Sequence, residues 1–179
     1  MKLLPEKVAR LFLTGRLKLL KAAAFVLVND SDAEVTLDRN TLINVLHPAS
    51  RIESLTAAST LTAADNGKVF TLNLATGFAT TLPAVAAGLH FLFFCGTAPS
   101  GGAYTIVTPG SANIIRGGVN ELETDTGDDG PSVTAGDTIT FADGVAVVGD
   151  HVELFCDGTY WYLRGQAAAD GGVAPSQAS

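Results

Sequence analysis

The chain has 179 residues, of which 47% are hydrophobic and 16% are charged, with 19 glycines and a formal net charge of −7 at pH 7. This length suits one main body with an extension, and the apolar content excludes disorder of the whole chain. A low charged fraction with many glycines is typical of short strands joined by tight turns rather than of long solvated helices.

Charge is distributed unevenly along the chain. Residues 1–21 hold six of the eleven basic residues and one acidic residue, whereas the remainder holds five basic and seventeen acidic residues. The body is therefore strongly acidic, and its own field opposes nucleic acid, so we expect no direct nucleic-acid contact there. For the basic segment itself, a solvated or partner-facing amphipathic helix is favoured over a segment that binds polyanions.

Residues 1–24 read as a basic amphipathic arm, helical or extended. Pro5 and Glu6 suit a first helical turn, and Gly15 can end or kink the helix. The apolar positions at helical spacing are Leu4, Val8, Leu11, Phe12, Leu19 and Ala22. Such a stripe needs cover from its own body, from a sister subunit or from another protein.

The same arm is not expected to bind or cross a membrane. No stretch of about 18 uncharged apolar residues is present, and an acidic body would be repelled by anionic lipid. The apolar run over 19–28 is interrupted by Lys21 and is not followed by a small-x-small cleavage site. We therefore expect a cytoplasmic product.

Residues 25–60 are interpreted as a hairpin and a connector. Two short apolar runs around a polar turn predict a hairpin over 25–37. Residues 38–46 fit either a helix or a strand, and His47-Pro48 ends either one, because proline pushes the residue before it out of the helical region. The Ser-, Thr- and Ala-rich stretch over 49–60 is predicted to be a connector.

Residues 61–165 predict a mainly β body. Short apolar runs alternate there with Gly, Pro, Asn and Asp turns, and the predicted strands are 68–74, 78–82, 89–95, 103–108, 113–116, 138–141, 145–148, 151–156 and 159–164. Their spacing favours an antiparallel β-sandwich or small barrel over parallel crossovers. Asp157-Gly158 gives the clearest hairpin turn. Residues 166–179, rich in Ala, Gly and Ser, are predicted to be a flexible tail.

Residues with catalytic or ligand chemistry are scattered, so we expect no enzyme, no catalytic residue and no cofactor. His47, His90 and His151 lack metal-binding spacing, and the serines lack a nucleophile elbow. His90 should face outward, because it alternates with Phe91 and Phe93. Cys95 and Cys156 each end an apolar run, which favours buried reduced thiols and leaves a disulfide between them as the alternative.

An acidic segment over 121–130 offers Asp125, Asp128 and Asp129 as oxygen ligands for calcium. Counting from Asp125, however, places glycines at the third and last ligand positions of an EF-hand loop. These three residues are therefore weak metal candidates, and a solvated surface loop is the favoured interpretation.

An aromatic cluster at Tyr160, Trp161 and Tyr162 is the densest in the chain. Strand alternation sends Trp161 to one face and the two tyrosines to the other. Such a cluster suits a carbohydrate platform, but a strand packed at a subunit interface is the favoured interpretation. The three residues are thus subunit-interface candidates.

Several strand-and-turn segments resemble the β-rich structural proteins of tailed bacteriophages, and most of all their small capsid decoration or cement proteins. The segments lie at 61–73, 81–89, 104–109, 113–118 and 157–162. The resemblance covers residues 61–165 and consists of turn and strand patterns rather than of chemical signatures. Similar modules occur in phage fibre and tail proteins.

This resemblance implies a homotrimer of β-sandwich or β-tulip bodies seated on the outer capsid surface of a virion assembled in the host cytoplasm. Its partners would be the major capsid protein and itself, and its arms would reach along neighbouring capsid subunits. The arm residues that would bind the capsid are Lys2, Leu4, Lys7, Val8, Arg10, Leu11, Phe12, Arg16 and Lys18. The alternative is a fibre or tail adhesion module that binds host surface glycans through the aromatic cluster.

Overall fold

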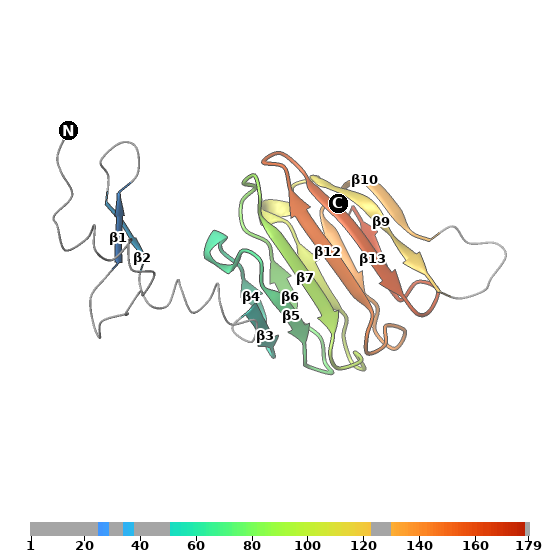
Figure 1. The fold of residues 1–179 in the computed structure, drawn as a ribbon. Coiled ribbons are helices and arrows are strands. Elements are labelled where there is room, and N and C mark those ends of the chain that lie inside the picture. Colours follow the sequence, from blue (N-terminus) through green and yellow to red (C-terminus); the bar gives the residue numbers. More distant parts are fainter. Residues whose placement is uncertain (1–24, 29–33, 38–50, 123–129, 178–179) are drawn as a thin grey trace, which may run out of the picture. The chain divides into compact units, whose positions relative to one another are not determined.

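The computed structural model describes residues 25–28, 34–37, 51–122 and 130–177 (Figure 1). The chain divides into two compact units, Met1–Leu46 and His47–Ser179. In the first unit, β1 (Phe25–Val28) pairs with β2 (Glu34–Leu37) in antiparallel register. The hairpin predicted over 25–37 is therefore confirmed. The predicted arm over 1–24 and the undecided element over 38–46 lie outside the described residues.

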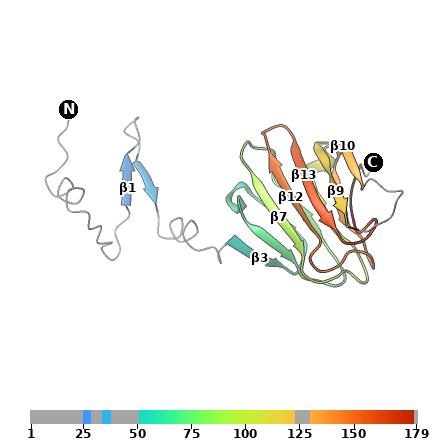
Figure 2. The same cartoon turned by 45° about the vertical axis from the view of Figure 1, so that its right-hand side comes forward.

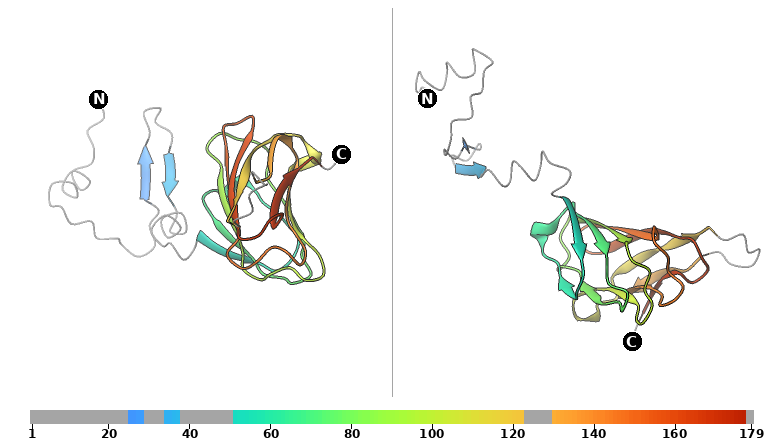
Figure 3. Two further views of the ribbon diagram at one scale, coloured as in Figure 1. Left: turned by 90° about the vertical axis from the view of Figure 1, so that its right-hand side faces the viewer. Right: turned by 90° about the horizontal axis from the view of Figure 1, so that it is seen from below.

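The second unit is a β body of two sheets that face each other as a sandwich (Figures 2 and 3). The seven-stranded sheet contains, in spatial order, β10 (Ser132–Gly136), β9 (Ile115–Glu121), β13 (Trp161–Ala167), β12 (His151–Cys156), β7 (His90–Cys95), β5 (Val69–Leu72) and β3 (Ile52–Leu55). The five-stranded sheet contains β14 (Val173–Ser176), β11 (Thr138–Phe141), β8 (Tyr104–Val107), β6 (Ala79–Thr81) and β4 (Ser59–Thr60). The mainly β, sandwich-like fold is thus confirmed.

The prediction that the body is antiparallel throughout is wrong. Parallel pairs join β3 to β5, β5 to β7, β4 to β6, β6 to β8 and β9 to β13. The first four of these pairs arise because successive strands from β3 to β9 alternate between the sheets, so every second strand returns to the same sheet in the same direction. The β9–β13 pair instead joins strands far apart in the chain. An arch between two sheets and a hairpin within one sheet need similar turn residues and lengths, so strand spacing cannot distinguish them.

Side-chain alternation along each strand builds the core. In β7, Phe91, Phe93 and Cys95 are buried, whereas His90 is exposed on the opposite face, as predicted. The core also takes in Phe70 from β5 and Trp161 from β13, both without exposed area. Full burial of one such large side chain stabilises the fold by about 1.5–3 kcal/mol.

The body begins earlier and ends later than the predicted limits of 61 and 165. Strands β3 and β4 fall within the predicted connector, and β14 falls within the predicted flexible tail. Val173 and Pro175 are buried where β14 pairs with β11, so the tail prediction is wrong. The many small residues around Val173 and Pro175 hide the alternation of buried and exposed positions along β14.

Other boundaries also differ from the predicted ones. Residues 145–148 form a turn rather than a strand, because the backbone N–H groups of Val145 and Ala146 both donate to the Ala142 carbonyl. Val148 is 65% exposed in that turn. Strand β10 was not predicted, and β9 and β13 run beyond the predicted 113–116 and 159–164. The described residues include no helix with the length and hydropathy of a membrane span.

The two cysteines are free and buried, which confirms the prediction of reduced thiols. They lie on neighbouring strands, but the antiparallel register places them at opposite ends, with His90 opposite Phe155 and Phe94 opposite His151. At about 3.4 Å per residue the cysteines are roughly 20 Å apart along the sheet, far beyond disulfide reach. Burial raises the pKa of Cys95 to about 11.

Candidate functional site

The outer face of the seven-stranded sheet carries three rows of side chains across β7, β12, β13 and β9. The first row is His90, Phe155, Tyr162 and Arg116. The second row is Leu92, Glu153, Arg164 and Gly118, and the third is Phe94, His151, Gln166 and Asn120. The rows exist because the registers align these positions, and cross-strand neighbours on one face are close enough to interact.

The first row is ordered by ring and hydrogen-bond contacts. The Phe155 and Tyr162 rings stack with centroids 5.4 Å apart, and the Arg116 guanidinium lies 3.5 Å from the centroid of the Tyr160 ring. The Tyr162 hydroxyl donates to the Asp157 carboxylate at 3.0 Å. These contacts hold the aromatic side chains at this end of the face in place.

Asp157 also closes the hairpin between β12 and β13. Its Oδ1 accepts hydrogen bonds from the backbone N–H groups of Thr159 and Tyr160 at 2.7 and 2.8 Å. These bonds hold the pKa of the Asp157 carboxyl below its usual value, and the carboxylate in turn raises the pKa of Tyr162. The predicted hairpin turn at Asp157-Gly158 is confirmed.

The structure separates the three predicted aromatic residues. Tyr160 and Tyr162 lie on the outer side, whereas Trp161 has no exposed area and packs against Phe91 with ring centroids 5.7 Å apart. Trp161 is therefore wrong both as an interface contact and as part of a carbohydrate platform, because its face of β13 is the core face. Tyr160 and Tyr162 remain interface candidates.

A charged cluster occupies the second row. The Glu153 carboxylate accepts a hydrogen bond from the Arg164 Nε–H and lies 2.7 Å from His90 Nε2. The bond from Arg164 is the main cause of the lowered pKa of Glu153, and His90 adds to it. The same bond raises the pKa of Arg164. Glu153 is thus held as an anion with a fixed orientation.

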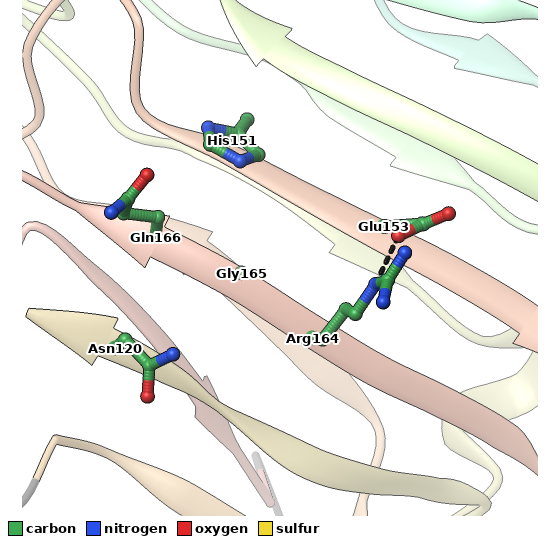
Figure 4. Close-up of a pocket in the computed structure, with 6 residues that line it drawn as sticks. All are labelled: Asn120, His151, Glu153, Arg164, Gly165 and Gln166. Carbon is green, nitrogen blue, oxygen red and sulfur yellow. Dashed lines mark hydrogen bonds and ion pairs between the residues drawn. The ribbon is translucent and has the colours of Figure 1, made fainter.

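Between the second and third rows the face is hollowed (Figure 4). The hollow has a volume of about 320 Å³ and is lined by Asn120, His151, Glu153, Arg164, Gly165 and Gln166. It lies over Gly165 of β13, which has no side chain to fill it. Its lining combines one carboxylate, one guanidinium, two carboxamides and an imidazole within three adjacent strands.

The sequence did not predict this hollow. The alternation of His151 with Glu153, and of Arg164 with Gln166, was a readable sign of an outward polar face. Asn120 could not be placed beside them, because β9 joins β13 by a parallel pairing between segments far apart in the chain. Only the sheet order brings these residues together.

Other predicted residues are not tested by this geometry. The arm residues, His47, and the weak metal candidates Asp125, Asp128 and Asp129 lie outside the described residues. Within the described ranges, no three His, Cys, Asp or Glu side chains are grouped to hold a metal ion. His90 and His151 both lie on the outer face, the latter with its Nδ1 3.1 Å from the Gly149 carbonyl oxygen.

Comparison with protein-family models, with curated proteins and with solved structures found no match.

Proposed function

We propose that this protein is a structural component of a tailed-bacteriophage particle, which binds the outer capsid surface through its basic N-terminal segment and adds a β body to the shell. The proposed assembly is a homotrimer. The supporting observation is that the charge asymmetry follows the division into units. Met1–Leu46 contains seven basic and five acidic residues, whereas His47–Ser179 contains four basic and thirteen acidic residues.

This division of charge between the two units suits a protein that attaches to a larger partner through its N-terminal segment. An amphipathic basic segment can place its apolar stripe in a groove of a partner and its charges on acidic partner residues, which increases both association rate and specificity. The acidic body would be repelled by a surface of its own sign, so the basic segment would set the orientation of binding. Cementing then needs only added contact area across the joints between capsid subunits.

The strand-and-turn resemblance to decoration proteins gives the second line of support. Its segments contribute to β5, β8, β9 and the turn between β12 and β13, which are integral parts of the sandwich. A folded β body joined to a separate N-terminal unit is also the organisation that the resemblance implies.

The test is co-sedimentation with empty capsids of the parent bacteriophage, comparing the full chain with a variant lacking residues 1–24. The variant should keep a folded body by circular dichroism and lose capsid binding. Full capsid occupancy by the shortened protein would contradict the proposed attachment. Sedimentation equilibrium of the full chain tests the trimer, and a monomer would rule it out.

Two matched sets of substitutions separate the contributions of charge and apolar contact. One set replaces Lys7, Arg10, Arg16 and Lys18 with Gln, and the other replaces Leu4, Leu11 and Phe12 with Ser. The first set should slow association and remove its salt dependence, whereas the second should speed dissociation. Wild-type binding by both sets would exclude the arm as the attachment site.

A further inference from the structure

Two arginine side chains beside the hollow on the outer sheet face are held by contacts with neighbouring residues. The long Arg164 side chain is drawn toward Glu153 on β12, and Arg116 lies over the Tyr160 ring. Gly165, which lines the hollow, contributes no side chain to it. With both guanidinium groups held by these contacts, the sheet face carries an open recess of about 320 Å³.

The lining offers several hydrogen-bonding groups, of which Glu153 and Arg164 are held by their mutual bond. Asn120 and Gln166 each present a donor and an acceptor, Glu153 presents acceptors, and a guanidinium has five donors, of which the bond to Glu153 uses the Nε–H. Hydrogen bonds to such charged groups are stronger than those between neutral groups. Figure 4 shows these polar side chains around the hollow, with Arg164 turned to Glu153.

Two rings of the third row, Phe94 and His151, contact each other. The His151 ring packs against Phe94 in a tilted arrangement, with centroids 5.0 Å apart and an interplanar angle of 33°. His151 is also placed by the contact of its Nδ1 with the Gly149 carbonyl oxygen. A ligand in the hollow would therefore meet polar groups along its length and the His151 ring at one side.

We infer that this hollow is a carbohydrate-binding site that takes one or two neutral pyranose rings. Adjacent sugar hydroxyls each donate and accept, which matches carboxamide, carboxylate and guanidinium groups, while sugar C–H groups suit the face of the His151 ring. The volume lies at the lower end of the range of roughly 300–1,000 Å³ for small-molecule sites. The inference goes beyond capsid attachment and does not depend on it.

Other ligand classes fit the lining less well. A phosphate group or nucleic acid would face the Glu153 carboxylate on a body with thirteen acidic residues. A hydrophobic peptide would find no apolar side chain in the lining. A metal ion would have only Glu153 and His151 as side-chain ligands of the usual types there.

The test uses the full chain and saturation-transfer NMR with glucose, galactose, mannose, N-acetylglucosamine, rhamnose, maltose, cellobiose and lactose. At least one of these sugars should bind at up to about 10 mM, the weak range for single-site sugar recognition. Asn120→Ala and Gln166→Ala should each weaken that binding roughly fivefold to tenfold. Asn113→Ala and Gln177→Ala are matched controls at exposed described positions outside the hollow, and they should bind as the wild type.

Two results would overturn the inference. The first is the absence of a signal from the whole sugar panel, or equal binding by the hollow variants and the controls. The second is a change of oligomeric state in Asn120→Ala or Gln166→Ala by sedimentation velocity, which would make the face a subunit interface. Loss of capsid binding by the arm variants leaves the sugar result unchanged, so the two proposals fail separately.

Discussion

The two halves of the β body use similar turn residues to build different topologies. From β3 to β8 every strand crosses to the opposite sheet, and the pairings between these strands are parallel. From β9 to β14 the chain also crosses between the sheets, but two connections, β9–β10 and β12–β13, are hairpins within one sheet. The contrast teaches that turn chemistry marks where a strand ends and does not choose the sheet that receives the next one.

The halves nevertheless share one core. The Phe70 ring in the first half stacks on Phe93 at 5.2 Å and lies 6.2 Å from Phe91. Phe91 in turn contacts Trp161 in the second half at 5.7 Å. This continuous aromatic chain should make the body unfold as one unit despite its two topologies.

The largest expected effect concerns the last strand of the second half. Deletion of residues 172–179 removes β14, exposes the edge of β11 and uncovers the core around Val173. We expect loss of the cooperative thermal transition, measured by circular dichroism. Deletion of residues 178–179 alone is the control and should leave the transition unchanged. A normal transition in the longer deletion would show that the second half does not need its edge strand.

Core truncations test whether the halves are coupled. Phe70→Ala in the first half and Trp161→Ala in the second should each reduce the free energy of unfolding by about 3–5 kcal/mol. Urea unfolding should keep a single transition in both variants, because the aromatic chain spans both halves. Two separate transitions in either variant would contradict the shared core. The control Phe155→Ala removes a 46% exposed ring and should cost much less.

Glycine substitutions compare an arch with a hairpin. Gly77 has φ +65°, and an added Cβ would lie 2.2 Å from the Ala103 carbonyl oxygen, whereas Gly158 has φ +101° and a nearest Cβ contact of 3.4 Å. Replacing either glycine with Ala should cost about 1–3 kcal/mol of stability, because Ala disfavours the left-handed conformation. Gly77→Ala should cost more in urea unfolding, because backbone must also move. Equal losses would mean that the arch is no more tightly constrained than the hairpin.

The smallest effect is a dependence of stability on pH in the second half. The pKa of Glu153 is lowered from 4.5 in the folded protein. The stability contributed by its ionised carboxylate is therefore fully present above about pH 4.5 and is lost as the pH falls through the folded pKa. Glu153→Gln and Arg164→Gln should therefore show a smaller loss of urea midpoint below pH 4.5. Arg51→Gln, at an exposed position elsewhere, should retain the wild-type profile. A wild-type profile in Glu153→Gln would exclude this contribution.

Local pattern was enough to predict much of the fold. Alternation located β7 and β12, and the turn pair Asp157-Gly158 identified the hairpin. Alternation also separated Trp161 from its tyrosine neighbours, but it could not say which side of the strand is the core. That choice depends on the second sheet, whose position is set by contacts between distant segments.

The candidate site was less predictable for the same reason. Its residues come from β9, β12 and β13, and the parallel pairing of β9 with β13 follows from sheet order rather than from any local signal. Strand β14 was missed because two buried residues among small ones give too short a pattern. The predictions thus failed where a sequence pattern was too short to recognise, and where the contacts join segments far apart in the chain.

The single tryptophan provides a built-in optical reporter. Trp161 lies on the core side of β13, whereas Arg164 and Gln166 of the hollow lie on the opposite side of the same strand. Its fluorescence should therefore follow the integrity of the sandwich and respond little to occupancy of the outer face. One sample can then yield two independent signals, emission for folding and ligand-detected NMR for binding.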